Sequence, residues 1–508
     1  MGIKYTLFCE KLLTKIRCVI KFMSRERRAI GMPRDKIMSV LEKHRMDTVG
    51  FIPIESCRVT MERRLSDLPE GTKSVIVIAI PYRMNDKGNI SAYAAPMDYH
   101  YFVSELEKTL IKDLRELFEG EDFVILADKS PIDERDAAMR AGIGCIGKNS
   151  LLITEKYSSY VFIAEIYTTL EIPSTEKEIS FCEGCGACLD ACPSKDFCLS
   201  AITQKKGALS KKEADLIRST GVIWGCDICQ EVCPHSVCAA DTPIEFFRQN
   251  RTPYITKELL FNMSDEEFGK RAYSWRGRKT IERNLDIMET KKVLFIGNSY
   301  TFYNDLPVLF KSLASENGFE CDVDSVTRGG YWLTQHADLS DECGKRADEL
   351  LSGKKYDFVI LQDNSMATVK DPERFMRGVS ELCEKIKKNG AKTVLYQTWG
   401  RKEGSPILND ISMTSEEMSL AVENGYKNAE EQFSAMRSPV GKYFRELSRC
   451  SDIELYNNDK SHPSFAGSYL AACVFFFTMF GIKPLYPAKE AKENLSEEEE
   501  KLLREYVK

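Results

Sequence analysis

Nine of the 18 cysteines fall between Cys182 and Cys238, in short and regular spacings. Clustering of this kind is typical of metal binding rather than of disulfide bonding. The segment CEGCGACLDACP has the C-x2-C-x2-C-x3-C-P spacing of bacterial ferredoxins, in which three thiolates of one loop bind a [4Fe–4S] cubane and the fourth points to a second cubane. The cysteines of this segment are Cys182, Cys185, Cys188 and Cys192.

A second cubane is indicated by the segment CDICQEVCP, in which Cys233 precedes a proline just as Cys192 does. The crossed arrangement of two-cluster ferredoxins predicts that these two cysteines exchange clusters. The spacing leaves Cys198 or Cys238 as the fourth ligand of the second cluster. Zinc is the alternative metal, but structural zinc sites rarely repeat a triple C-x2-C-x2-C with a trailing C-P. The predicted ligands are Cys182, Cys185, Cys188 and Cys233 for one cluster, and Cys192, Cys226 and Cys229 for the other.

Polar residues and glycines stand at the ends of the apolar runs in the second half of the chain. Ser299 follows VLFIG, and the segment DKSHPS brings Asp459 and His462 near the last predicted strand. The GNS segment by itself is equally typical of a strand-to-helix turn in which the serine caps the helix. The other strand-end residues are Gly329, Gly330, Gln362, Asp363 and Asn364.

The elements that must position these residues are strands alternating with helices. VLFIG, YDFVILQ, KTVLYQTW and IELYN read as strands, and the helical stretches between them predict a parallel sheet with covering helices. Ligands of such sheets bind at the carboxyl ends of the strands. Because KKVLFIG begins a strand directly after the helical segment that ends in DIMET, we place a domain boundary near Thr290.

The first half has strand and helix signals of its own ahead of the cysteines. KSVIVIAIPY at 73–82 and FVILAD at 123–128 predict buried strands, and SELEKTLIKDLRELF between them predicts a helix. The second strand ends on Asp128, which from its position alone is expected to cap the following helix. The clusters therefore serve a larger domain than a plain ferredoxin.

Composition indicates a soluble protein of two or three domains. The chain has 508 residues and a formal net charge of −6, so it has no global attraction to nucleic acid or anionic membranes. Lysines and arginines interrupt the apolar residues at the N-terminus, and the apolar run at 469–482 is too short to span a bilayer. We expect a cytoplasmic protein without a membrane span. The basic segment RAYSWRGRK at 271–279 is either a phosphate contact or a solvated helix face.

Five segments of the first half together resemble the epoxyqueuosine reductase family of cobalamin-dependent iron–sulfur enzymes, from about Asp35 to Met288. They are GNISAYAAPMDYHYFV, ADKSPIDERDAAMRAGIGCIGKNSLLI, CEGCGACLDACP, CLSAITQKKG and WGCDICQEVCP. In that family the cysteine at the position of Cys198 completes the second cluster, and the aspartate of a D-x-x-P segment, here Asp128, is the proton donor. The resemblance therefore implies two [4Fe–4S] clusters, a cobalamin and an external electron donor of the ferredoxin or flavodoxin type.

The cobalamin pocket of the family corresponds to residues in two of these segments, GNISAYAAPMDYHYFV and the glycine-rich GIGCIGKN. The matching residues are Tyr93, Asp98, Tyr99, His100, Lys148 and Asn149. The chain has fewer residues than typical members between GFIPIE and the strand at 73, and it lacks the helical-repeat tail of longer members. Both departures bear on the tRNA substrate of the family, so tRNA is an open partner here, while the cluster segment is complete.

The order of the strand-end residues in the second half resembles the SGNH (GDSL-like) hydrolases, and most closely a subfamily with serine in FIGNSYT. The resemblance implies that His462 takes the proton of Ser299 and that Asp459 holds the imidazole. Backbone N–H groups of Ser299 and Gly330 would bind the oxyanion, together with the side-chain amide of Gln362 or Asn364. The usual aspartate before the serine is Asn298 here.

We thus expect an α/β multidomain protein. An α+β reductase domain carries a ferredoxin-like double-cluster insert, and a flavodoxin-like α/β hydrolase domain follows it. The alternatives are an electron-transfer module without cobalamin joined to an independent esterase, or to an SGNH domain that binds a ligand without turnover. The expected segments are a basic extension at 1–33, a cobalamin-binding region at 34–180, the cluster module at 181–240, closing helices at 241–290, the hydrolase domain at 291–488 and a charged helix at 489–508.

Overall fold

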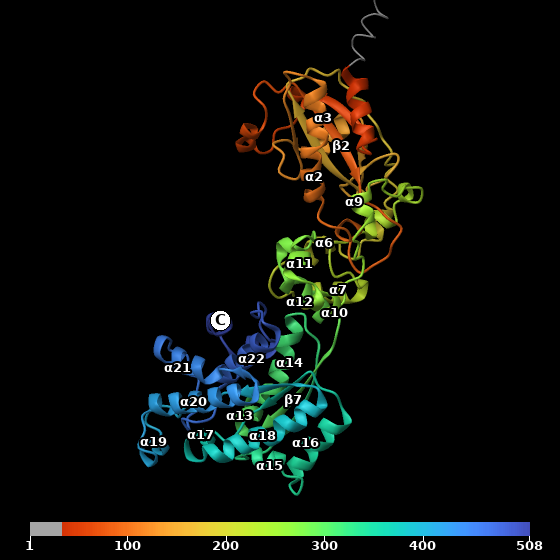
Figure 1. Cartoon of the computed structure of the whole chain (residues 1–508). Coiled ribbons are helices and arrows are strands. Elements are labelled where there is room, and N and C mark those ends of the chain that lie inside the picture. Colours follow the sequence, from red (N-terminus) through yellow and green to blue (C-terminus); the bar gives the residue numbers. More distant parts are fainter. Residues whose placement is uncertain (1–32, 508) are drawn as a thin grey trace, which may run out of the picture. The chain divides into compact units, whose positions relative to one another are not determined.

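The computed structural model describes residues 33–507, and these form two compact units that interleave along the chain (Figure 1). The first unit contains the chain up to Ser200 together with Trp224–Gly277, and the second contains Ala201–Ile223 and Arg278–Lys508. This division differs from the boundary expected near Thr290, because two helical segments ahead of that residue pack with the second unit. Almost all of the expected N-terminal extension lies outside the described residues.

The first unit is built on an antiparallel sheet with the strand order β1-β2-β6-β3. Every residue of β2 is buried, as its β-branched sequence predicts, and the apolar residues of the strands alternate between two faces. One face packs against α2, α3 and a helix at 33–43, and the other packs against α4. The elements are β1 (Val49–Pro53), β2 (Ser74–Pro81), α2 (Tyr99–Lys108), α3 (Leu110–Leu117), β3 (Phe123–Leu126), α4 (Glu134–Arg140) and β6 (Val161–Thr168).

The helix expected over SELEKTLIKDLRELF is divided in the structure. α2 ends at Lys108, and Thr109 caps both α2 and the start of α3. Leu106 of α2 and Leu110, Ile111 and Leu114 of α3 stay buried against the sheet, so the division changes the direction of the chain without exposing this apolar face.

The cysteine-rich part of the first unit consists of short helices joined by loops. α5 follows the C-x2-C pair of Cys182 and Cys185, α8 contains the second cysteine of the pair Cys226 and Cys229, and the two helices pack against each other. The short elements of the unit are β4 (Cys145–Ile146), β5 (Leu152–Ile153), α5 (Ala187–Asp190), α8 (Ile228–Glu231), α9 (Glu245–Arg248), α10 (Lys257–Asn262) and α11 (Asp265–Gly269). α6 (Leu199–Thr203) lies across the division between the two units.

The second unit contains a five-stranded parallel sheet with the order β11-β10-β9-β7-β8. Numbered within the unit this is the 2-1-3-4-5 order of flavodoxin-like sheets, whose chain reverses direction across the sheet between the first and third strands. Ligands of such sheets bind outside the carboxyl ends of those two strands. The strands are β7 (Lys291–Gly297), β8 (Cys321–Thr327), β9 (Phe358–Leu361), β10 (Lys392–Tyr396) and β11 (Met436–Ser438).

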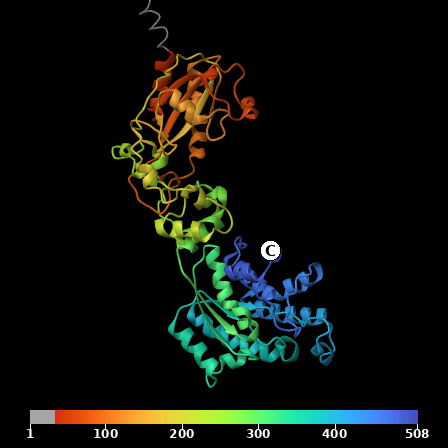
Figure 2. The same cartoon turned by 180° about the vertical axis from the view of Figure 1, so that it is seen from behind.

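Helices cover both faces of this sheet (Figures 1 and 2). Alternate residues of β7, β9 and β10 pack against α14, α21 and α22 on one face and against α15, α16, α18 and α20 on the other. The bounds are α13 (Ser299–Phe302), α14 (Leu306–Glu316), α15 (Leu333–Ala337), α16 (Glu342–Gly353), α17 (Ala367–Lys370), α18 (Pro372–Asn389), α19 (Pro406–Asp410), α20 (Ser415–Phe433), α21 (Val440–Cys450), α22 (Phe465–Phe480), α23 (Lys489–Asn494) and α24 (Glu497–Tyr506).

Two helices that precede β7 in the chain belong to this unit, namely α7 (Lys211–Thr220) and α12 (Arg278–Ile287). The guanidinium of Arg218 on α7 donates to the backbone oxygens of Ile287 and Gly318. Lys211, at the other end of α7, forms an ion pair of 3.0 Å with Glu320. These bonds explain why the closing segment of the first half groups with the sheet of the second.

Three expectations about the second unit have different outcomes. The apolar run at 469–482 falls largely within α22, which is buried over most of its length, so the prediction of a buried helix is confirmed. IELYN is not a strand, because only Tyr456 of this segment bridges another residue, Pro463. The fifth strand is instead β11, and the charged C-terminal helix is divided into α23 and α24 by the capping residue Ser496.

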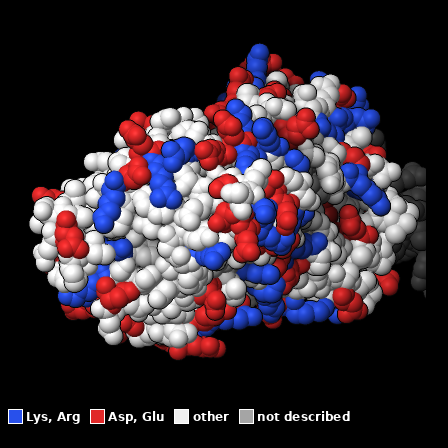
Figure 3. Space-filling view, turned by 90° about the horizontal axis from the view of Figure 1, so that it is seen from below, with Lys and Arg blue, Asp and Glu red and all other residues white. Residues whose placement is uncertain are grey.

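Acidic and basic side chains are interspersed on the surface that Figure 3 shows. This matches a chain in which 71 basic residues are nearly balanced by 77 acidic ones. Within the described residues no helix is both long and apolar enough to cross a membrane.

Candidate functional site

Ser299 lies at the sharp turn between β7 and α13, at the carboxyl end of the sheet. It is the first residue of the helix, and the preceding Asn298 is the cap, with its Oδ1 accepting the N–H of Tyr300 at 3.2 Å. The Asn298 amide also donates to the backbone oxygen of Tyr331 at 2.9 Å. The serine is therefore not needed as a cap, and asparagine supplies a donor that the aspartate of related sequences lacks.

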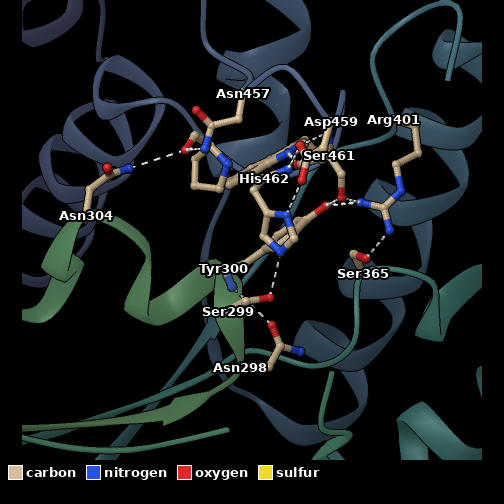
Figure 4. A network of polar contacts seen from close by, with 12 residues as sticks. Asn298, Ser299, Tyr300, Asn304, Ser365, Arg401, Asn457, Asp459, Ser461 and His462 are labelled. Atoms are coloured by element: carbon tan, nitrogen blue, oxygen red, sulfur yellow. Dashed lines mark hydrogen bonds and ion pairs between the residues drawn. The ribbon is translucent and has the colours of Figure 1, made fainter. Parts of the chain in front are cut away.

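Ser299, His462 and Asp459 form a continuous chain of hydrogen bonds (Figure 4). His462 Nε2 lies 2.9 Å from Ser299 Oγ, and His462 Nδ1 lies 2.5 Å from Asp459 Oδ2. The other oxygen of Asp459 accepts the backbone N–H groups of Ser461 and His462. Burial opposes ionisation of Asp459, but these hydrogen bonds outweigh it and lower the pKa of the carboxyl. The aspartate is thus held as an anion against the imidazole.

The loop that carries His462 is fixed at both ends. Its base is closed by the bridge between Tyr456 and Pro463, and the backbone N–H of Asn457 donates to the oxygen of His462 at 2.8 Å. The ring of Tyr303 stacks on the imidazole, with 4.3 Å between ring centroids. The imidazole therefore has one orientation, with its Nε2 toward the serine.

The structure separates the two amides that could contribute to an oxyanion site. Gln362 is fully buried, and its Oε1 accepts hydrogen bonds from the Asn298 backbone and the Thr301 hydroxyl. The Asn364 amide instead donates to the backbone oxygen of Gly330 at 3.1 Å. Gly330 has a φ of +74°, and the space where a Cβ would stand is open. Asn364 and Gly330 thus lie side by side, whereas Gln362 supports the turn before the serine.

Asp363 holds the loops on which these residues stand. Its Oδ1 accepts the backbone N–H groups of Leu333 and Asn364, and the carboxyl is fully buried. Burial raises the pKa of Asp363 to about 7. A second buried ionisable residue, Arg401, follows β10 and contacts Tyr300, Ser365 and Ser461. Sequence reasoning missed it, although its position after the predicted strand KTVLYQTW is the kind of signal that identified the other strand-end residues.

The first unit contains a second arrangement of aspartate, histidine and an acidic oxygen. Asp98 Oδ1 lies 2.7 Å from His100 Nδ1 and also accepts the backbone N–H of His100 at 3.0 Å. His100 Nε2 faces Asp128 Oδ2 at 3.5 Å. The hydrogen bond to Asp98, supported by the charge of Asp128, raises the pKa of His100. His100 is therefore easier to protonate than a free imidazole.

Asp128 does not cap the helix that follows it. The N-cap of α4 is Asp133, which accepts the N–H of Asp136 at 3.2 Å. Asp128 lies in a left-handed conformation, with a φ of +60°, and its side chain is 59% exposed. The expectation of a helix cap is wrong, because the loop is longer than the sequence pattern indicates. The carboxyl is left facing solvent and His100.

Aromatic and acidic side chains line the protein side of this loop. Tyr99 stacks on Phe162 with ring centroids 4.1 Å apart, and the Tyr93 hydroxyl accepts the indole N–H of Trp224 at 3.0 Å. Burial, followed by the charge of Asp128, raises the pKa of Tyr99 well above its usual range.

Two buried carboxyl groups next to Asp128 were missed by sequence reasoning. They belong to Glu134 at the start of α4 and to Glu165 within β6. Burial, followed by the charge of Asp128, raises the pKa of Glu134 to about 7, and burial, followed by the charge of Glu134, raises the pKa of Glu165 well above its usual range. Because they are separated from each other and from Asp128 in the sequence, no local pattern connects the three residues.

The four cysteines predicted to hold the first cluster line one cavity of about 130 Å³. The same cavity is lined by Lys148 and Asn149, which places these two residues against the cysteines. Four thiols around one cavity are the donor set of a cubane. The cysteines are Cys182, Cys185, Cys188 and Cys233, and Cys233 is buried with the β4–β5 hairpin.

The cysteines predicted for the second cluster are also neighbours. Burial raises the pKa of Cys229 to about 11, and the adjacent thiols of Cys198, Cys188 and Cys192 contribute in the same direction. Cys226 is next to Cys229 and Cys198. Cys198 is thus a neighbour of Cys226 and Cys229, and its choice over Cys238 as the fourth ligand stays a prediction. Among the described residues no three His, Cys, Asp or Glu side chains are arranged around a single metal ion.

Comparison with known proteins gives results for both units. The family model for epoxyqueuosine reductase QueG, DUF1730, matches residues 63–128. The chain is 30% identical over 242 residues to the epoxyqueuosine reductase of Lactococcus garvieae, covering 42% of this chain and 68% of that protein. It is 31% identical over 242 residues to the epoxyqueuosine reductase of Gloeobacter violaceus, covering 44% of this chain and 75% of the relative.

A solved structure from Slackia heliotrinireducens, a proposed SGNH hydrolase, is 32% identical to part of the chain, with a TM-score of 0.35. It covers 38% of this chain and all of that structure. The matches to the curated reductases extend over more than two thirds of the relatives' own length. The chain belongs to the epoxyqueuosine reductase family.

Proposed function

We propose that the chain is a bifunctional enzyme, in which a cobalamin-dependent iron–sulfur reductase is joined to a serine ester hydrolase of the SGNH type. The reductase proposal rests on the acidic oxygen of Asp128, which is exposed and held against His100 in a domain with two groups of four cysteines. The hydrolase proposal rests on the hydrogen-bonded chain from Asp459 through His462 to Ser299.

The residues around Asp128 fit a large polar cofactor that binds at the protein surface. Asp128 and His100 are both more than half exposed, and Tyr99 forms the floor behind them. Cobalamin bound there would supply a reducing cobalt centre, and the clusters would pass it electrons one at a time from a ferredoxin or flavodoxin. Such thiol-rich clusters suit the reducing cytoplasm, which we propose as the location.

Reductive removal of an epoxide oxygen to leave an alkene consumes two electrons and two protons and releases water. Asp128 would donate a proton to the departing oxygen from its Oδ2, which is the general-acid role. His100 Nε2, 3.5 Å away, would stabilise the carboxylate that results and hold a proton for its next cycle. Asp98 would keep the imidazole in place through Nδ1.

In the hydrolase site, His462 Nε2 would remove the proton of Ser299 as Oγ attacks the ester carbonyl. The C–O bond to the alcohol then breaks, and the imidazolium returns the proton to the departing alkoxide. A water molecule repeats the sequence on the acyl-enzyme and releases the acid. Asn364 and the backbone N–H groups of Ser299 and Gly330 would bind the oxyanion.

Metal and cofactor content test the reductase proposal. We expect about eight irons and eight sulfides per chain after anaerobic purification, and stoichiometric binding of added cobalamin. Cys198→Ser should lower the iron content toward about four, while the matched variant Cys238→Ser should retain eight. Stoichiometric zinc without visible charge-transfer absorption would exclude the clusters, and cluster-loaded protein that ignores cobalamin would favour the simple electron-transfer module. A tRNA stem-loop with epoxyqueuosine is the first substrate to assay.

Hydrolysis of p-nitrophenyl acetate by the full-length protein tests the second proposal. We expect turnover that a fluorophosphonate stops by reacting with one residue, Ser299, identified by peptide mass spectrometry. A protein that is neither active on short esters nor labelled at Ser299 would be a ligand-binding SGNH domain.

A further inference from the structure

Arg401 is a buried cation at the centre of the hydrolase site. It follows β10 at the carboxyl end of the sheet, and the whole residue is only 7% exposed. Its Nη1 donates to the hydroxyls of Tyr300 and Ser461, and its Nη2 donates to the hydroxyl of Ser365 at 2.8 Å. Figure 4 shows the guanidinium pointing at these hydroxyls from the side opposite Asn304.

The three acceptors are the direct chain neighbours of three site residues. Tyr300 follows Ser299, Ser365 follows Asn364, and Ser461 precedes His462. These neighbours come from three separate segments, namely the start of α13 after β7, the loop after β9 and the loop before α22. One planar guanidinium therefore connects the loop of the nucleophile, the loop of the oxyanion amide and the loop of the base. A planar, preorganised fork loses less freedom for each bond than a flexible ammonium would.

The base of Arg401 is itself fixed by the fold. The Ser415 hydroxyl donates to the backbone oxygen of Arg401 at 2.6 Å, and the Tyr456 hydroxyl donates to the oxygen of Gly400 at 3.1 Å. The indole of Trp399 donates to the backbone oxygen of Ser461 at 3.0 Å, a second bond between this loop and that of His462. A Cβ on Gly400 would stand 2.5 Å from the Ser419 hydroxyl, so the backbone here has no room to shift.

The guanidinium of Arg401 donates hydrogen bonds to hydroxyl groups and lies over the ring of Tyr300, 5.8 Å from its centroid. Within residues 33–507, no carboxylate is among its hydrogen-bond or ion-pair partners. Burying a guanidinium without a counter-ion costs stability, and an apolar residue of similar volume is often neutral or better in that respect. We therefore expect Arg401 to contribute to the geometry of the site rather than to the stability of the fold.

We propose that Arg401 is the positioning residue of the hydrolase site, setting the distances among Ser299, His462 and Asn364 by holding the adjacent residue of each loop. The inference rests on the proposed ester hydrolysis. It acts through Tyr300, Ser461 and Ser365 and involves no contact with the substrate. Displacements of about 1 Å in such a constellation cost on the order of 100-fold in rate.

Full-length Arg401→Met is the test, since methionine keeps an unbranched apolar stem at this position and removes the three bonds. We expect kcat on p-nitrophenyl acetate to fall about 100-fold with KM changed less than threefold, and methylguanidinium in solution to restore part of the rate of an Arg401→Ala variant. Arg437→Met is the matched control, because that half-buried arginine bonds to Glu430 and Gln397 and not to the site loops. A kcat within twofold of the parent in Arg401→Met would overturn the proposal.

A second measurement does not depend on turnover. The proton between His462 and Asp459 should give a downfield nuclear magnetic resonance signal, identified by its loss in Asp459→Ala. In Arg401→Met we expect it to shift or disappear, while Arg437→Met should leave it in place. If the parent protein hydrolyses no ester but the signal responds in this way, the hydrolase proposal fails and the positioning role stands. If the signal is unchanged in Arg401→Met, the positioning role is wrong, even in an active enzyme.

Discussion

The two units place the same pair of residues, an aspartate and a histidine, behind different reactive oxygens. In each unit the aspartate binds the imidazole through Nδ1 and also accepts the backbone N–H of the same histidine. In the second unit Nε2 faces the hydroxyl of Ser299 at 2.9 Å, and in the first it faces the carboxyl of Asp128 at 3.5 Å. The third residue decides the chemistry, because a hydroxyl needs a base whereas a carboxyl can itself be the acid.

The two arrangements also differ in how complete they are. In the second unit, Ser299 follows β7 while Asp459 and His462 lie on the loop before α22, and contacts within the chain close this arrangement, from Tyr303 on the imidazole to Arg401 behind it. His100 and Asp128 are about half exposed, and their longer separation leaves space on the surface. A site made only of side chains can be recognised from its own geometry, whereas a site that takes cofactors shows only the protein's share of it.

Removing the serine should produce the largest effect. We expect Ser299→Ala to lower kcat/KM on p-nitrophenyl acetate by about 10⁴- to 10⁶-fold, leaving what the oxyanion site and binding contribute. Steady-state kinetics of the full-length protein measure this. Ser340→Ala, on a loop outside the site, is the control and should behave like the parent protein. If Ser299→Ala keeps the activity of the parent, then Ser299, His462 and Asp459 are not a catalytic triad.

Breaking the pair itself in the second unit should have a smaller effect. Asp459→Asn keeps an acceptor for the backbone N–H of His462 but cannot stabilise the imidazolium, so we expect a loss of about 10⁴-fold or less. Rates at high pH should recover in part as hydroxide replaces the base. A loss in Asp459→Asn as large as that in Ser299→Ala would show that the aspartate holds the loop as well as the imidazole.

In the first unit the corresponding change is Asp128→Asn. The amide preserves the shape of the loop but cannot donate an acidic proton, and we expect reductive turnover to fall by about 10²- to 10⁴-fold with iron and cobalamin content unchanged. Asp133→Asn is the matched control, since that residue caps α4 and asparagine caps equally well. If Asp128→Asn turns over normally, the parallel between the two units is only geometric.

Much of this arrangement could be predicted from sequence, because the informative residues form local patterns. The spacing of the cysteines, the buried runs of β2 and β7, and the motif that carries Asp459 and His462 are each readable within a few residues. The predicted groups of cysteines around each cluster agree with the neighbours seen in the structure, although their ligation remains a prediction.

What could not be predicted depends on residues that meet only in the folded chain. β11 has three residues and the sequence MRS, which has no apolar pattern, whereas the more hydrophobic IELYN fits the pattern of a strand. The role of Arg401 requires three loops that are far apart in sequence. The grouping of α7 with the second unit rests on long-range bonds such as that from Arg218 to Gly318.

Changing a histidine outside both pairs, His336, should have the smallest effect. His336 on α15 is fully buried, and its Nε2–H donates to the backbone oxygen of Gly297 at 2.9 Å, directly before the Asn298–Ser299 turn. Its Nδ1 has no hydrogen-bond partner, so protonation would place an unpaired cation in the core. Burial accordingly lowers the pKa of His336 to about 4.

The sign of the pH effect follows from this shift. Between pH 6.5 and about 4 the unfolded chain binds a proton at His336 that the folded chain does not, so stability is complete above pH 6.5 and falls by about 3 kcal/mol as the pH drops through this window. The raised pKa of Asp363 makes the folded chain more stable as the pH falls, over a pH range that overlaps with that of His336. The pH dependence of the parent protein's stability is therefore the sum of these two opposite effects. His336→Gln, which retains a donor for Gly297 and cannot ionise, isolates the histidine. Amide hydrogen exchange in β7, corrected for intrinsic rates, measures this effect. Below pH 6.5 the parent protein should lose protection relative to His336→Gln. A difference in protection that stays constant from pH 4 to 8 would mean that His336 has the same pKa in the folded and unfolded chain.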